Sequence, residues 1–253
     1  MISVQTKKIA SIPSLIVTKT KQLDQPLPLF VYFHGFTSAK EHNLPIAYLL
    51  AQEGYRVVLP DSHYHGAREK GVSESKRHLS FFEIVLNNVE ELELIRDYFA
   101  TKELIADDRI GIAGTSMGGI TTAAALTKYE WIKAAGIFMG SPQLTKFAQR
   151  VINRMKQADE LPVSDEAIND LYEQLEQYDL SKQISLLNER PLFMWHGEAD
   201  SVVPFEDTYQ FYHQVKDHYE NKGMLKFVPE KDTDHKVSRF AILEAVNWFK
   251  KHL

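Results

Sequence analysis

The chain has 253 residues, of which 44% are hydrophobic and 25% are charged, and its formal net charge is −5. These values are close to the averages for soluble globular proteins, so they exclude an intrinsically disordered chain and allow one domain with a continuous core. The charges are spread without long runs of one sign, which argues against a nucleic-acid partner, and the absence of cysteine excludes disulfides and thiol catalysis.

Short apolar runs alternate with helical stretches along the chain, which is typical of βαβ units around a mostly parallel sheet. We expect eight strands, at residues 3–9, 14–18, 29–33, 55–59, 109–114, 135–139, 191–195 and 224–228. The first two are separated by too few residues for a helix, and Pro13 lies in the connection. They should therefore form an antiparallel hairpin at one edge of the sheet.

Apolar side chains recur at three- and four-residue spacing from Phe82 to Phe99 and again near the C-terminus, which predicts amphipathic helices. Gly54 follows another helical stretch and is well placed to end it. The segment at about 142–189 has two helical patterns and lies between two core strands. We interpret it as a small helical cap inserted into a single domain, 1–253, and we expect it to limit the size of a substrate.

The five residues from Gly114 to Gly118 read GTSMG and stand directly between a predicted strand and a predicted helix. A serine at such a sharp turn is held in strained backbone geometry, and small residues two positions away let neighbouring backbone approach. The helix dipole behind the turn favours negative charge that develops at the serine. The pattern indicates that Ser116 is a nucleophile.

A serine hydroxyl is a weak nucleophile near neutral pH, so an imidazole must accept its proton and a carboxylate must orient that imidazole. Asp200 and His235 follow two successive strands in the order that α/β-hydrolases require behind Ser116. Asp232 and Asp234 lie nearer to His235 in sequence. A carboxylate beside the histidine on a tight loop reaches Nδ1 poorly, so Asp200 is the expected acid.

Three motifs together resemble the small bacterial esterases related to dienelactone hydrolases and to the catalytic domain of prolyl oligopeptidases. They are the turn at Ser116, the stretch HGEADSVVP from His196 to Pro204, and His34-Gly35-Phe36 after an early strand. The resemblance spans roughly Leu29 to the C-terminus. It implies an α/β-hydrolase fold with about eight strands, helices on both faces and a small cap. Dienelactone hydrolases carry cysteine at the nucleophile position, so serine here favours ester over lactone hydrolysis.

The resemblance also implies an oxyanion hole, formed by the backbone N–H groups of Phe36 and of Met117, the residue after the nucleophile. It places His34 and Gly35 at the substrate site, where His34 is expected to hold the loop by hydrogen bonding. Arg68 follows the fourth strand and is a candidate to meet a substrate carboxylate.

His63 and His65 alternate in the loop that follows the fourth strand, but no further ligand stands nearby at metal-binding spacing. We therefore expect no metal and no cofactor. Ser11 and Pro13 interrupt the apolar run that a signal peptide needs, and no apolar stretch reaches the roughly 20 residues of a spanning helix. These features predict a cytoplasmic protein without a membrane partner.

The sequence thus predicts a serine hydrolase that cleaves carboxylic esters, with short acyl chains, through an acyl-enzyme. A small-molecule ester is the expected partner, and the oligomeric state is left open. A serine peptidase, or a thioesterase or deacetylase, would use the same triad. A catalytically silent binding protein on this fold is the alternative from a different class, since a fold does not fix a function.

Overall fold

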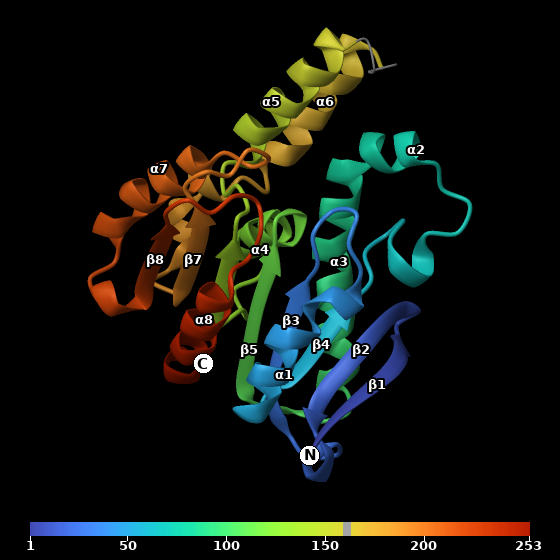
Figure 1. Ribbon diagram of the computed structural model, residues 1–253, viewed down its shortest axis with the longest axis vertical. Helices are drawn as coiled ribbons and strands as arrows, with labels where there is room; N and C mark the ends of the chain where they lie inside the picture. The colour runs from blue at the N-terminus through green and yellow to red at the C-terminus, as the bar shows by residue number, and fades with distance from the viewer. Residues whose placement is uncertain (159–162) are drawn as a thin grey trace.

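Eight strands form one sheet in the computed structural model, which describes residues 1–158 and 163–253 (Figure 1). Their order across the sheet is β1-β2-β4-β3-β5-β6-β7-β8. The strands are β1 (Ile2–Ile9), β2 (Ile12–Lys19), β3 (Leu27–Phe33), β4 (Arg56–Pro60), β5 (Ile105–Thr115), β6 (Ala134–Phe138), β7 (Leu192–Gly197) and β8 (Leu225–Glu230). The predicted α/β-hydrolase architecture is confirmed.

The sheet is parallel from β4 to β8, and β1 and β2 add an antiparallel hairpin at one edge. Ala10 and Ser11 connect these two strands with positive φ angles of 47° and 72°. Such angles at both central residues give a tight turn whose twist matches that of the strands. The hairpin prediction is therefore confirmed, although Pro13 lies within β2 rather than in the connection.

Helices cover both faces of the sheet (Figure 1). One face is covered by α1 (Leu44–Gln52) and α8 (Arg239–His252), and the other by α3 (Phe81–Ala100), α4 (Met117–Lys128) and α7 (Phe205–Val215), with α2 (Glu74–Leu79) preceding α3. Successive side chains of a strand point to opposite faces, so central strands must be apolar throughout. In β3, Val31 and Phe33 pack on the α3 and α4 side, whereas Phe30 and Tyr32 pack on the α1 and α8 side.

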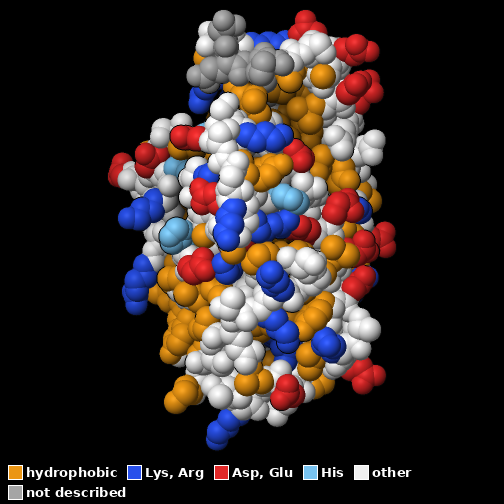
Figure 2. Space-filling view, turned by 90° about the vertical axis from the view of Figure 1, so that its right-hand side faces the viewer, with side chains coloured by type: hydrophobic (Ala, Val, Ile, Leu, Met, Phe, Trp, Pro, Cys, Tyr) orange, Lys and Arg blue, Asp and Glu red, His pale blue; other side chains and the backbone are white. Residues whose placement is uncertain are grey.

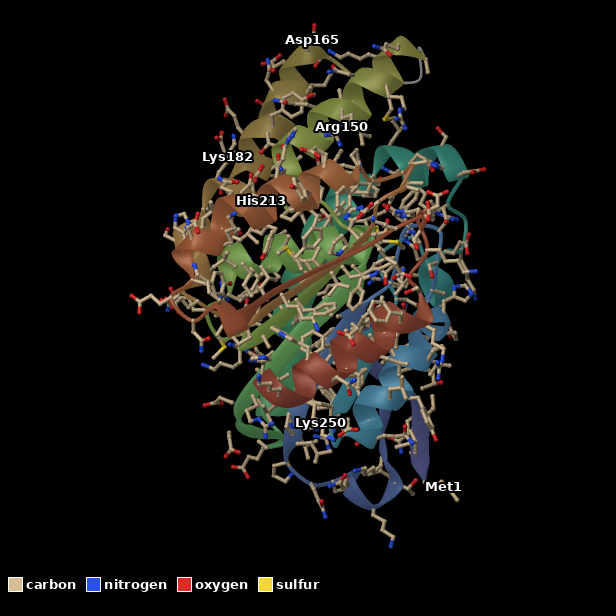
Figure 3. The ribbon with its side chains drawn as sticks, turned by 60° about the vertical axis from the view of Figure 1, so that its left-hand side comes forward. Met1, Arg150, Asp165, Lys182, His213 and Lys250 are labelled. Carbon is tan, nitrogen blue, oxygen red and sulfur yellow. The ribbon has the colours of Figure 1, made fainter. Side chains whose placement is uncertain are left out.

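Between β6 and β7 the chain carries α5 (Leu144–Gln157) and α6 (Asp165–Glu176), which extend away from the sheet (Figure 1). Arg150 lies on α5 (Figure 3). Its Nη1 and Nη2 donate to the buried carboxylate of Asp207, at 3.0 and 2.9 Å, and so fasten α5 to α7. The interpretation of residues 142–189 as an inserted cap stays a prediction. Residues 159–162 of that segment lie outside the described residues.

Acidic and basic side chains intermingle over the face of the molecule that Figure 2 shows, with hydrophobic side chains between them. Among the helices of the described residues, none combines the length and the apolar character that crossing a bilayer requires.

Candidate active site

Ser116 lies at the sharp turn between β5 and α4, with φ 54° and ψ −113°. Its N–H donates to the carbonyl oxygen of Phe138 on β6 at 2.8 Å. A Cβ atom at Gly118 would lie 2.2 Å from the carbonyl oxygen of Phe33, and one at Gly114 would lie 2.3 Å from the backbone of Gly118. Both positions therefore require glycine, because a larger residue would force β3, β5 and α4 apart.

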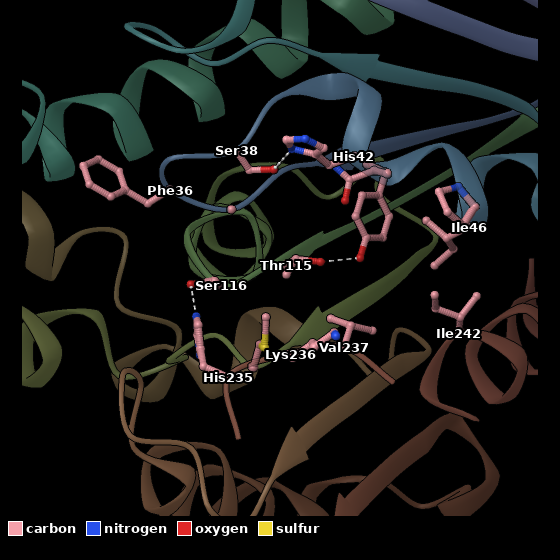
Figure 4. A pocket seen from close by; sticks show the side chains of 15 residues that line it. Phe36, Ser38, His42, Ile46, Thr115, Ser116, His235, Lys236, Val237 and Ile242 are labelled. Carbon is pink, nitrogen blue, oxygen red and sulfur yellow. Dashed lines mark hydrogen bonds between the residues drawn. The ribbon is translucent and has the colours of Figure 1, made fainter. Parts of the chain in front are cut away.

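The side chains of Ser116, His235 and Asp200 form one chain of hydrogen bonds. Ser116 Oγ lies 2.8 Å from His235 Nε2 (Figure 4). His235 Nδ1 lies 2.7 Å from Asp200 Oδ2. Ser116 follows β5, Asp200 follows β7 and His235 follows β8. Since the carboxyl ends of parallel strands meet at one edge of a sheet, residues 119 positions apart come into contact there.

The Asp200 carboxylate is completely buried and has four hydrogen-bond donors around it. Oδ1 accepts from the N–H groups of Val202 and Val203, each at 2.9 Å, while Oδ2 faces His235 and His196. Burial raises the pKa of Asp200, but the hydrogen bonds from His196 and His235 outweigh it and hold this pKa below its usual range. Asp200 is thus an ionised acceptor at neutral pH.

Asp234, the rival acid, makes different contacts. Its Oδ1 accepts from the N–H and the hydroxyl of Ser201, at 2.9 and 3.0 Å, and from the N–H of His235 at 2.8 Å. It therefore ties the loop after β8 to the loop after β7. The imidazole of His235 turns instead to Asp200.

The two residues expected to form an oxyanion hole lie beside the serine. Met117 is the first residue of α4, where an N–H group has no acceptor within its own helix. Gly35, just before Phe36, packs so closely on the turn that a Cβ there would lie 3.6 Å from Ser116 Cβ. The side chain of Phe36 lines the pocket at Ser116, whereas the side chain of Met117 belongs to the core.

His34 is buried and joins two loops. Its Nε2 accepts from the N–H of Ser62 at 3.0 Å, so Nδ1 carries the proton and donates to the carbonyl oxygen of Gly35 at 2.8 Å. His65 repeats the arrangement, because its Nε2 accepts from the N–H of Thr37 at 3.1 Å and its Nδ1 lies 2.7 Å from the carbonyl oxygen of His63. Of the two predicted substrate contacts in this motif, Gly35 lines the pocket and His34 lies behind it.

This burial makes stability depend on pH. Burial is the main cause that lowers the pKa of His34 from 6.5 to about 4, with the hydrogen bond to Gly35 opposing it. Below its ordinary pKa the unfolded chain binds a proton on this imidazole that the folded chain does not. We expect the free energy of unfolding to fall by roughly 3 kcal/mol from this group between about pH 6.5 and 4, and to be unaffected by it above that range.

Urea titrations across that pH range test the expectation. His34→Gln should show a shallower pH dependence than the wild type, and the matched change at exposed His218, His218→Gln, should leave it unaltered. Identical pH slopes for His34→Gln and the wild type would contradict the assignment.

Arg68 is fully engaged within the protein. Its Nη1 and Nη2 each donate to the Glu91 carboxylate of α3 at 2.8 Å, and Nη1 also donates to the carbonyl oxygen of Asp61 at 3.1 Å. The guanidinium does not line the pocket at Ser116. Contact between Arg68 and a substrate carboxylate stays a prediction, and it would compete with this bidentate pair.

A pocket of about 450 Å³ opens beside Ser116 (Figure 4). Ile46 of α1 and Ile242 of α8 face each other at its far end (Figure 4). Tyr32 and Thr115 contribute hydroxyl groups that lie 2.6 Å apart. These residues were not predicted from the sequence, although the position of α1 just after the His34-Gly35-Phe36 loop is a signal that α1 borders the site.

The model of the family described as "Prolyl oligopeptidase family" matches residues 43–253. The chain belongs to this family. The candidate esterase YitV of Bacillus subtilis (strain 168) is 45% identical and the esterase YjfP of Escherichia coli (strain K12) is 28% identical, each over the full length of both chains. The crystal structure of TT1662 from Thermus thermophilus shares the fold, with a TM-score of 0.79 at 19% identity over 99% of this chain and 98% of that one.

These findings confirm the resemblance expected from the three motifs, and they identify the protein as a serine hydrolase of the α/β-hydrolase fold. The matched region includes Ser116, Asp200 and His235, but begins after the His34-Gly35-Phe36 loop. The oxyanion-hole assignment of Phe36 therefore depends on the loop geometry described above.

Proposed function

We propose that this protein hydrolyses carboxylic esters through an acyl-enzyme on Ser116. The observation that carries the proposal is the continuous hydrogen-bond chain from Ser116 Oγ through His235 to the buried Asp200 carboxylate, with distances of 2.8 and 2.7 Å. The strained turn, the exposed side of the serine and the pocket beside it give the hydroxyl access to a carbonyl carbon.

In the proposed reaction His235 Nε2 accepts the hydroxyl proton while Ser116 Oγ attacks the carbonyl carbon of the ester. The N–H groups of Phe36 and Met117 donate to the oxyanion. The ester C–O bond then breaks, and the proton passes from Nε2 to the leaving alcohol. A water molecule, deprotonated by His235, then attacks the acyl carbon, the bond from this carbon to Ser116 Oγ breaks, and the proton returns from Nε2 to Oγ as the carboxylic acid leaves. Asp200 stays ionised throughout and fixes the imidazole.

Ester hydrolysis is favoured over peptide or thioester hydrolysis because the relative that is 45% identical over its whole length is named as a candidate esterase, and the one that is 28% identical is named as an esterase. Labelling with a fluorophosphonate probe is the first test, and reaction at Ser116 is the expected result. An absence of labelling in folded protein would favour a silent binding protein. The rates of hydrolysis of an ester, a thioester and an anilide of the same acyl group are then compared. Faster hydrolysis of the anilide than of the ester would favour a peptidase.

The pocket beside Ser116 favours short acyl chains. Among the described residues its apolar walls come from α1, the end of β6, the loop before α8 and α8 itself, at Ile46, Met139, Val237 and Ile242. None of the described lining residues belongs to 142–189, and the limit that the predicted cap sets on substrate size stays a prediction. A volume of about 450 Å³ is at the small end of the range for ligand sites.

We therefore expect kcat/KM for p-nitrophenyl esters to be highest between acetate and butyrate and to fall by about tenfold or more at decanoate, since a chain longer than the pocket must displace packed wall residues, and overpacking typically costs about 1–3 kcal/mol. Ile242→Ala, which enlarges the far end of the pocket, should shift the optimum to longer chains. The same change at the exposed Leu94 of α3, Leu94→Ala, should not. A rate that rises steadily to long chains in the wild type would contradict the proposal.

A cytoplasmic location and a small-molecule ester as the partner remain part of the proposal. They rest on the sequence patterns described above.

A further inference from the structure

Asp200 shares one carboxylate oxygen between two imidazoles. Oδ2 lies 2.7 Å from His235 Nδ1 and 3.1 Å from His196 Nε2. The two histidines differ in exposure, because His196 is completely buried while the side chain of His235 is 18% exposed. His196 lies near the end of β7, four residues before Asp200, so its backbone is part of the sheet.

The hydrogen-bond partners of His196 fix the proton on Nε2. This nitrogen faces two acceptors, Asp200 Oδ2 and the carbonyl oxygen of Val203 at 3.0 Å, so it must carry a hydrogen. With the hydrogen on Nε2, Nδ1 accepts from the hydroxyl of Thr208 at 2.8 Å, and the same Oγ1 lies 3.0 Å from the carbonyl oxygen of Gly140. One buried ring thus connects the acid loop to α7 and to the end of β6.

The ring of His196 has little freedom to turn. Phe205 packs edge-on against it, with ring centroids 5.9 Å apart and an interplanar angle of 90°. Hydrogen bonds at both ring nitrogens also fix the rotation of the imidazole about its Cβ–Cγ bond. The Nε2–H group of His196 is thus fixed in position, and it can in turn fix the position of an acceptor that it contacts.

We propose that His196 is a positioning residue, whose Nε2–H group holds Asp200 Oδ2 in the direction of His235 Nδ1. The backbone N–H groups of Val202 and Val203 hold only the other oxygen, Oδ1. Without His196 the carboxylate can rotate about its Cβ–Cγ bond and leave the plane in which His235 needs it. The inference rests on the triad proposed above and assigns to His196 no contact with substrate.

Glutamine and asparagine form a matched pair of tests at this position. In His196→Gln the side-chain amide reaches the region of Nε2 and can donate to Asp200. In His196→Asn the amide reaches only the region of Nδ1, toward Thr208. Both replacements are polar and hydrogen-bonded, so they differ mainly in which partner of the imidazole they keep.

We expect His196→Gln to keep kcat within about tenfold of the wild type, and His196→Asn to lose on the order of 100-fold with KM changed less than threefold, since a small misplacement of a catalytic group can cost that much. Turnover of p-nitrophenyl butyrate is measured per active site, titrated with the fluorophosphonate. Equal losses in both variants, or a normal kcat per labelled site in His196→Asn with only a lowered melting temperature, would overturn the inference.

Failure of the wild type to label at Ser116 would refute the proposed function itself, and so is distinguishable from failure of this inference. If His196→Asn does not fold, His196→Met takes its place, because methionine has a similar length and lacks the donor. A normal kcat per labelled site in His196→Met would overturn the inference, and the same loss of about 100-fold would support it.

Discussion

Ser116→Ala is expected to lower kcat for short acyl esters by a factor on the order of 10⁶, by comparison with the loss of the nucleophilic serine in a subtilisin triad. The hydroxyl is the attacking group in the proposed reaction. Among the described residues, no other hydroxyl is hydrogen-bonded to His235 Nε2. The fold should remain, because the substitution removes one oxygen and leaves the backbone bond from the Ser116 N–H to Phe138 in place.

Ser116→Gly is the matched control for this variant. It also lacks the hydroxyl, so it should be equally inactive. Glycine adopts the observed φ of 54° without strain, whereas alanine does not, and such strain costs on the order of 1–3 kcal/mol. The glycine variant should therefore have a higher melting temperature than Ser116→Ala. Turnover above about 1% of the wild type in both variants, after purification from contaminating esterases, would refute Ser116 as the nucleophile.

The strands and the three triad positions could be predicted from the sequence because their signals are local. A strand buried on both faces must be a continuous apolar run, as in β7, and a reactive residue must follow it at the carboxyl edge. Ser116, Asp200 and His235 each follow such a run, so their meeting point is dictated by parallel pairing alone. The turn at Ser116 adds a further local signal, because its glycines stand where a Cβ atom would clash with neighbouring backbone.

Other features were beyond the sequence because they depend on how helices pack across the sheet. Ile46 and Ile242 close one pocket although they come from opposite ends of the chain, and their meeting depends on α1 lying beside α8, where Tyr55 donates to the carbonyl oxygen of Phe249 at 3.1 Å. The pairing of Arg68 with Glu91 of α3 could not be predicted either, because the two residues lie 23 positions apart. Long side chains reach partners at no fixed spacing in the sequence, so such contacts cannot be predicted from sequence patterns.

Asp200→Asn is expected to lower kcat by about 10⁴-fold, the cost of the equivalent change in a protease triad. The structure gives the reason for this chain. Oδ1 receives two backbone N–H groups, from Val202 and Val203, so the carbonyl oxygen of the asparagine will take that place. Its NH₂ group is then directed at His235 Nδ1, which must accept. The proton moves to Nε2, which can no longer accept a proton from Ser116.

The same reasoning predicts small effects at the neighbouring acids. Asp234 uses a single oxygen, Oδ1, for its three hydrogen bonds to Ser201 and to the N–H of His235, and the carbonyl oxygen of an asparagine can accept all of them. Asp232 is exposed and has φ 54°, a conformation that asparagine adopts readily. Asp234→Asn and Asp232→Asn should therefore each keep kcat within about tenfold of the wild type, far above Asp200→Asn.

The three variants are compared by kcat at neutral pH, per active site and at saturating ester, so that a change in folding yield or in KM does not enter. A crippled Asp234→Asn beside a nearly normal Asp200→Asn would move the acid of the triad to the loop after β8. It would leave Ser116 as the nucleophile, because the hydrogen bond from Ser116 Oγ to His235 Nε2 does not depend on which carboxylate holds Nδ1. Equal, modest losses of kcat in all three variants would instead mean that the imidazole of His235 keeps its tautomer without a fixed carboxylate. The burial of the Asp200 carboxylate and the four N–H groups around it argue against that outcome.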